Sequence, residues 1–133
     1  MIAITPQDVK DFTSGGCSLL AEAIHAARPE YVLACFWAGR PCGHAFVKLP
    51  DGRYLDITGV HTHREMLDSG WGRPGKHHGR RSITTAHYTS ALCVNGRQAE
   101  LEFRARLLVP AVLALIPDLP TGRNIPAVNR RTP

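Results

Sequence analysis

The fold of this chain is decided by the stretch at residues 44–58, which reads HAFVKLPDGRYLDIT. Its turn signal, PDG at residues 50–52, separates two runs of alternating apolar and polar residues, 44–49 and 53–58, and this pattern predicts a β-hairpin. Pro suits the first central position of a type I turn, and Gly suits the left-handed position that follows. We therefore expect a three-residue hairpin loop with a bulge.

That loop sets the register of the two predicted strands. One face of the hairpin is then wholly apolar and carries Ala45, Val47, Leu49, Leu55 and Ile57; the other carries His44, Phe46, Lys48, Tyr54, Asp56 and Thr58. His44 and Asp56 become diagonal neighbours on the second face, with backbones roughly 7–8 Å apart. A two-residue loop would place them on opposite faces and put Lys48 among the core positions, so the apolar pattern favours the register that brings His44 near Asp56.

Cys17 follows the segment TSGG at residues 13–16 and begins a predicted helix that ends before Pro29. The N-terminus of a helix lowers the pKa of a cysteine placed there, because its unpaired N–H groups and its dipole favour negative charge. An imidazole can take the thiol proton, and a carboxylate can hold that imidazole in place. The sequence therefore predicts thiol catalysis, with Cys17 as nucleophile, His44 as base and then acid, and Asp56 as the group that orients His44.

Four further residues are candidates for secondary roles at this site. The backbone N–H of Cys17 and that of a neighbour, Gly16 or Ser18, are candidates to hold an oxyanion. Phe46 and Tyr54 share the His44 face and could contact substrate, although packing is the interpretation that we favour. The triad hypothesis requires the sulfur within about 4 Å of a His44 ring nitrogen. A sulfur enclosed in apolar packing, or an imidazole turned away, would contradict it.

The order and spacing of Cys17, His44 and Asp56 resemble the core of the papain-like and transglutaminase-like thiol enzymes. Residues 13–60, which carry this pattern, are also similar to small uncharacterised bacterial and phage proteins. The resemblance implies an α+β fold, in which a helix bearing Cys17 at its N-terminus packs on a small antiparallel sheet, with a C-terminal helix. It implies a small cysteine-dependent hydrolase or acyl-transferase that acts on a protein or peptide by peptide cleavage, deamidation or amide transfer, without a cofactor.

The chain departs from that family pattern in four respects. Thiol peptidases of this group often have an aromatic residue directly after the cysteine, where this chain has Ser18. Many also have an upstream Gln or Asn that helps to hold the oxyanion, and only Gln7 is available here. The interval from His44 to Asp56 is also short for this family, and the chain is small for a peptidase with a substrate cleft.

Composition indicates one domain over residues 1–116 and an irregular tail over 117–133. Hydrophobic residues make up 44% and charged residues 20% of the 133 residues, as in ordinary globular proteins. No apolar run is long enough to span a membrane, and the N-terminus lacks the pattern of a signal peptide. We therefore expect a cytoplasmic protein that has no membrane partner.

The net charge of +5 supports a second functional hypothesis. Its most concentrated basic segment contains Lys76, Arg80 and Arg81. Such a segment could engage an acidic surface or a nucleic-acid complex. The alternative is thus a non-catalytic binding or inhibitor protein, of phage or bacterial type, that covers an acidic host protein or nucleic-acid machine.

Metal binding is not expected from the distribution of His and Cys. The candidate zinc ligands lack the spacing of a structural site; they are Cys42 with His44, His61 with His63, and His77 with His78. Cys35 and Cys93 lie in apolar runs typical of a core, and the four cysteines are expected to be free thiols.

The remaining elements follow from caps and breakers. We expect helices at 6–12, 17–28 and 62–69, a strand at 31–37, and loops at 39–43 and 70–81. Residues 83–94 are ambiguous between strand and helix. A last amphipathic helix is expected over 96–115, kinked or split by Pro110.

Overall fold

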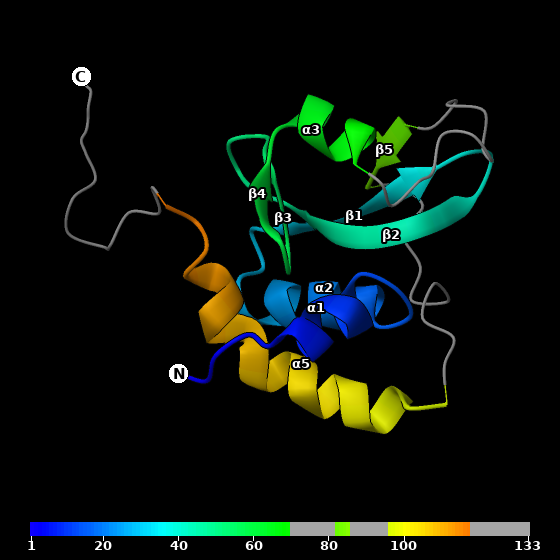
Figure 1. Cartoon of the computed structure of the whole chain (residues 1–133). Coiled ribbons are helices and arrows are strands. Elements are labelled where there is room, and N and C mark those ends of the chain that lie inside the picture. The colour runs from blue at the N-terminus through cyan, green and yellow to red at the C-terminus, as the bar shows by residue number, and fades with distance from the viewer. Residues whose placement is uncertain (70–81, 86–95, 118–133) are drawn as a thin grey trace, which may run out of the picture.

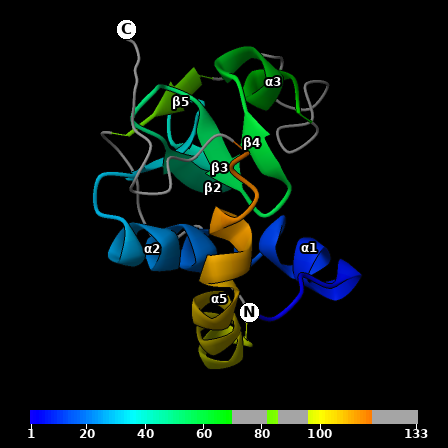
Figure 2. The ribbon, with the colours of Figure 1, turned by 90° about the vertical axis from the view of Figure 1, so that its left-hand side faces the viewer.

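The computed structural model of this protein describes residues 1–69, 82–85 and 96–117. Their elements are α1 (Pro6–Phe12), α2 (Cys17–Ala27), β1 (Val32–Trp37), β2 (Pro41–Lys48), β3 (Tyr54–Asp56), β4 (Gly59–His61), α3 (His63–Asp68), β5 (Ser82–Thr84) and α5 (Gln98–Leu113). The elements form layers, with α3 on one face of the sheet and α1, α2 and α5 on the other (Figure 1). The side view shows the same layers (Figure 2). The chain is therefore α+β with a C-terminal helix, as the sequence predicted.

The sheet has five strands in the order β4-β3-β2-β1-β5, and every neighbouring pair is antiparallel. Two apolar clusters cover its faces. The face toward α2 and α5 buries Ala45, Val47, Leu49, Leu55 and Ile57. The face toward α3 buries Phe46 and Tyr54 with Met66. The division of the hairpin into two faces is thus the one that the apolar pattern predicted.

The β2–β3 hairpin has the predicted register. Val47 lies opposite Leu55 and Lys48 lies opposite Tyr54. The turn is closed by the Gly52 N–H, which donates to the Leu49 carbonyl at 2.9 Å, and Gly52 has a φ of +95°. A left-handed glycine after a type I turn is the geometry expected of a three-residue loop with a bulge. This register places Asp56 on the strand beside the one that carries His44.

The loop expected at residues 39–43 is shorter than predicted, because β2 already begins at Pro41. The β1–β2 ladder slips at this point: Cys35 pairs with Ala45, but Phe36 pairs with Cys42. Gly43 and His44 are therefore left over on the β2 side, and Gly43 has a φ of +79°. A bulge of this kind re-aims the side chain that it carries. The direction of His44 is thus set by the bulge as well as by strand alternation.

The helices begin largely where their caps predicted. Thr5 and Thr62 each form a capping box, at the starts of α1 and α3. Pro110 lies inside α5 without splitting it, and α5 starts at Gln98, slightly later than expected. Of the ambiguous segment 83–94, the described part contributes to strand β5. The loop predicted at 70–81 and the tail from 118 onward lie outside the described residues.

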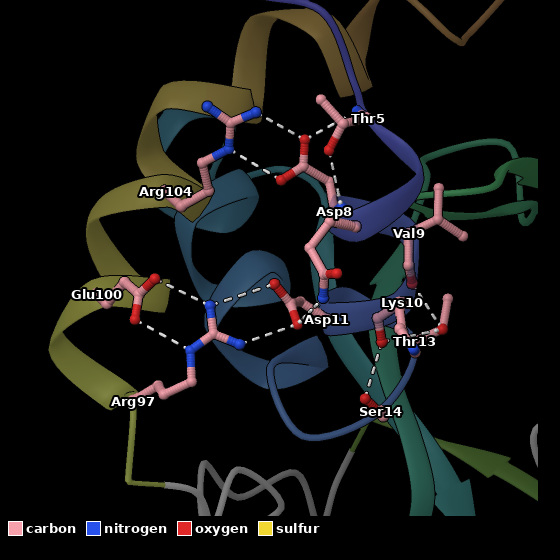
Figure 3. A network of polar contacts seen from close by, with 11 residues as sticks. Thr5, Asp8, Val9, Lys10, Asp11, Thr13, Ser14, Arg97, Glu100 and Arg104 are labelled. Atoms are coloured by element: carbon pink, nitrogen blue, oxygen red, sulfur yellow. Dashed lines mark hydrogen bonds and ion pairs between the residues drawn. The ribbon is translucent and has the colours of Figure 1, made fainter.

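Ion pairs join α1 to α5 (Figure 3). The Asp8 carboxylate accepts two hydrogen bonds from the Arg104 guanidinium, at 2.9 and 2.7 Å. Nearby, Arg97 pairs with both Asp11 and Glu100. Hydrogen bonding from Arg104 outweighs burial and lowers the pKa of Asp8 to about 2. The Asp8 carboxylate, in a residue only 4% exposed, therefore attaches α1 to α5.

Within the described residues, no helix is both long enough and apolar enough to cross a membrane.

Candidate active site

The candidate site begins at the N-terminus of α2. Cys17 is the first residue of this helix, and Gly16 is its N-cap. A Cβ at Gly16 would lie 3.0 Å from the Asp11 carbonyl oxygen and 3.1 Å from the Phe12 ring, so the preceding chain packs closely against this position. The absence of a side chain at Gly16 therefore allows α2 to start here. The start of α2 in turn fixes the position of the Cys17 side chain.

Helix α2 packs its first turn against β2. The Ala45 N–H donates to the Cys17 sulfur at 3.3 Å, which joins the helix N-terminus to the strand that bears His44. Cys17 is only 3% exposed and belongs to the apolar cluster on this side of the sheet. The sulfur thus lies largely in apolar packing, which weighs against the triad hypothesis, although the strand backbone supplies it with a polar contact.

His44 and Asp56 meet as the hairpin register predicted. The His44 Nε2 lies 2.8 Å from the Asp56 Oδ2, and the two residues are 0% and 3% exposed. Cys17 is the other side chain that raises the pKa of His44. Because Nε2 is directed to the carboxylate, Nδ1 is the nitrogen placed to exchange a proton with the thiol. All three predicted triad residues therefore come together.

The electrostatics of His44 favour its charged form. Burial lowers the pKa of His44, but hydrogen bonds with Asp56 and Cys17 and the charges of both groups outweigh it, and the pKa rises to about 9. Burial likewise raises the pKa of Asp56, yet hydrogen bonds from His44 and His61 reverse that shift and lower it overall. The pair thus holds an imidazolium against a carboxylate inside the molecule.

Two residues that sequence reasoning did not assign to the site complete the surroundings of Asp56. The Oδ1 atom accepts from the Thr58 backbone N–H at 2.8 Å and from the Thr58 hydroxyl at 2.5 Å, and the His61 Nε2 lies 3.3 Å away. The sequence suggests His61 only as a candidate zinc ligand. The signal that could have found it is the short segment between Asp56 and Gly59, which turns the chain back into β4 and returns His61 toward the carboxylate.

The secondary candidates have mostly packing roles. The Gly16 N–H donates to the Asp11 carbonyl at 2.9 Å, so in this structure it is not available to an oxyanion, and Ser18 is fully buried. Phe46 and Tyr54 are 1% and 3% exposed and stack edge to face, with ring centroids 5.3 Å apart. They belong to the core beneath α3, which agrees with the packing interpretation.

The basic residues Lys76, Arg80 and Arg81 lie outside the described residues, as do His77, His78 and Cys93. Cys35 is buried in the same apolar cluster as Cys17. Among the described residues, no three His, Cys, Asp or Glu side chains gather as they would around a metal ion.

Comparisons with known proteins returned no matching family model, no matching curated protein and no matching solved structure.

Proposed function

We propose that this chain is a thiol hydrolase or acyl-transferase that uses Cys17, His44 and Asp56. The observation that carries the proposal is the buried 2.8 Å hydrogen bond between His44 and Asp56, with Cys17 raising the pKa of the same imidazole. The arrangement also supports kinship with papain-like and transglutaminase-like enzymes, because the cysteine opens a helix that packs on the antiparallel sheet bearing the His and the Asp. The substrate class that fits is a peptide or carboxamide.

The chemistry follows from the two ring nitrogens of His44. The proton of the Cys17 thiol resides on Nδ1 before attack, which makes His44 the imidazolium that its raised pKa favours, and the sulfur then bonds the carbonyl carbon of the substrate. The imidazolium then gives that proton to the departing amine, and a thioester remains on Cys17. Water yields hydrolysis, and an amine yields amide transfer. Asp56 accepts from Nε2–H throughout, which holds the ring and stabilises its positive charge.

Burying the His44 imidazolium with the Asp56 carboxylate costs free energy. An imidazolium and a carboxylate that are almost inaccessible to water lose much of their hydration, and a well-packed apolar pair in the same volume is often as stable or more so. Titratable groups with strongly shifted pKa values are typical of functional sites. The network is therefore better explained by chemistry at Cys17 than by core stability.

The test is acylation of Cys17 by an activated ester, p-nitrophenyl acetate. We expect a burst of close to one p-nitrophenol per chain and an acetyl group located on Cys17 by mass spectrometry. Cys17→Ala should abolish the burst, whereas Cys35→Ala, the matched substitution of a second buried cysteine, should retain it. His44→Ala should slow the burst by about 100-fold or more. An unchanged burst in Cys17→Ala would contradict the proposal.

One observation favours the alternative function, a non-catalytic binding protein. Cys17, His44 and Asp56 are at most 3% exposed, so a substrate reaches the sulfur only when the structure opens. In that alternative the chain engages an acidic host protein or nucleic-acid complex through Lys76, Arg80 and Arg81. Binding that weakens steeply with salt, survives in Cys17→Ser and is lost in Arg80→Ala with Arg81→Ala would establish it.

A further inference from the structure

The Asp56 carboxylate is held on both of its oxygens. Oδ2 faces His44, while Oδ1 faces the two groups of Thr58 and the His61 ring. The Thr58 hydroxyl and the His61 Nε2 are themselves 2.8 Å apart, so the three side chains form a closed triangle of polar contacts. A carboxylate at the end of a short side chain turns easily about its last bond, and donors on Oδ1 determine which way Oδ2 points.

The proton positions in this triangle follow from what each atom can do. The ionised carboxylate only accepts, so the Thr58 hydroxyl donates to Oδ1. The lone pairs of that hydroxyl then face His61, and the proton on the His61 Nε2 is shared between the hydroxyl oxygen and Oδ1. His61 therefore acts as a donor toward Asp56, and a side chain able to donate an N–H could take its place.

We propose that Thr58 and His61 are positioning residues that fix the Asp56 carboxylate so that Oδ2 holds the His44 ring toward Cys17. The kinetic part of this inference rests on the proposed function; the geometric part stands without it. It also gives the β3–β4 hairpin a role, because pairing of Tyr54 with His61 across the two strands returns His61 to the site. The His61 side chain is 25% exposed and that of Asp56 only 2%, so the network reaches from the protein surface to the buried His44.

The primary test is the proton resonance of the His44 Nε2–H, measured by NMR in labelled protein. A short hydrogen bond to a carboxylate moves this resonance downfield and protects it from exchange with water. We expect the resonance to be lost or broadened in Thr58→Val and in His61→Ala. It should return in Thr58→Ser and in His61→Gln, because these variants restore a hydroxyl or an N–H donor.

His63→Gln is the matched control. His63 lies two residues beyond His61, but its Nδ1 contacts the Tyr54 hydroxyl at 3.0 Å rather than Asp56, so the resonance should persist. If Thr58→Val or His61→Ala does not fold, absence of the resonance in a folded Thr58→Ser or His61→Gln would equally overturn the inference.

The kinetic arm separates this inference from the proposed function. For acylation by p-nitrophenyl acetate, His61→Ala should lower the rate by up to about 100-fold, and His61→Gln should recover most of it. A wild type without acylation, but with a resonance that responds to these substitutions, ends the proposed function and leaves the positioning role. An active wild type whose resonance and rate are both unchanged in His61→Ala ends the positioning role.

Discussion

The charge state of His44 depends on both Asp56 and Cys17, and the hydrogen bond to Asp56 is the largest influence that raises its pKa. With Asp56 ionised beside it, the pKa of His44 is about 9 although its ring is fully buried. Substitution Asp56→Asn removes the negative charge and leaves the burial, which alone favours the neutral ring. We expect the pKa of His44 to fall below its ordinary value of about 6.5, as followed by NMR titration of the imidazole.

Asp51→Asn is the control for that measurement. Asp51 lies on the same hairpin, is half exposed at its side chain and pairs with Arg53, not with the site. The His44 titration should therefore be unchanged in this variant. A midpoint that stays near 9 in Asp56→Asn would show that Asp56 is not what holds the proton on His44.

Sequence reasoning found the pairs that depend on local rules. The Pro50–Gly52 turn and the apolar alternation were sufficient to place His44 beside Asp56, because a one-residue slip would have exposed the hydrophobic face. They were not sufficient to place His61. Its approach to Asp56 depends on a short strand that has too few residues to show a periodic pattern.

At the level of the elements, the start of α2 depends on the absence of a side chain at Gly16. In Gly16→Ala the new Cβ would press on the Asp11 carbonyl and the Phe12 ring. We expect a loss of about 1–3 kcal/mol in the free energy of unfolding, measured by urea denaturation, together with slower acylation of Cys17. Gly96→Ala, where a Cβ would meet nothing within 4 Å, should change neither.

The attachment of α1 to α5 gives a second prediction at this level. Asp8→Asn keeps the shape of the side chain but removes the charge that accepts both hydrogen bonds from Arg104 (Figure 3). We expect a loss of about 1–2 kcal/mol in the free energy of unfolding. Asp11→Asn, on the more exposed Arg97 pair, should cost less. Equal losses in the two variants would contradict a dominant role for Asp8.

Capping residues and breakers predicted most element boundaries, and the exceptions have a common cause. The capping boxes at Thr5 and Thr62 act within three residues, so they can be read from the sequence. The bulge at Gly43 and His44 and the edge strand β5 both depend on how a strand pairs with β1, which for β5 is distant in sequence. Such long-range pairing is not encoded by neighbouring residues.

At the level of the whole molecule, the buried charges predict a limited pH range of maximum stability. The pKa of His44 is raised, so its contribution is complete below about pH 6.5 and is lost as pH rises through about 9; this amounts to about 3 kcal/mol. The pKa values of Asp8 and Asp56 are lowered, so their contribution is present above about pH 4 and is lost as pH falls.

Urea denaturation across pH 3–10 would measure the loss of stability on both the acid and the alkaline side. The free energy of unfolding should be highest between about pH 4 and 7. The loss on the alkaline side that is due to His44 should disappear in Asp56→Asn, and the loss on the acid side should diminish in Asp8→Asn. A profile that is flat above pH 7 in the wild type would contradict the charged state assigned to His44.

Because Cys17 is inaccessible to solvent, turnover requires a transient opening of the fold. If Cys17 reacts only in the small fraction of molecules in an open conformation, the reaction rate is proportional to that fraction. Every 1.4 kcal/mol by which the contact between α2 and β2 is stabilised then slows the reaction about tenfold. Variants in which the α2–β2 contact is more stable should therefore be poorer catalysts. A moderate rise in temperature should increase their rate more than it increases the rate of an enzyme whose nucleophile is exposed to solvent.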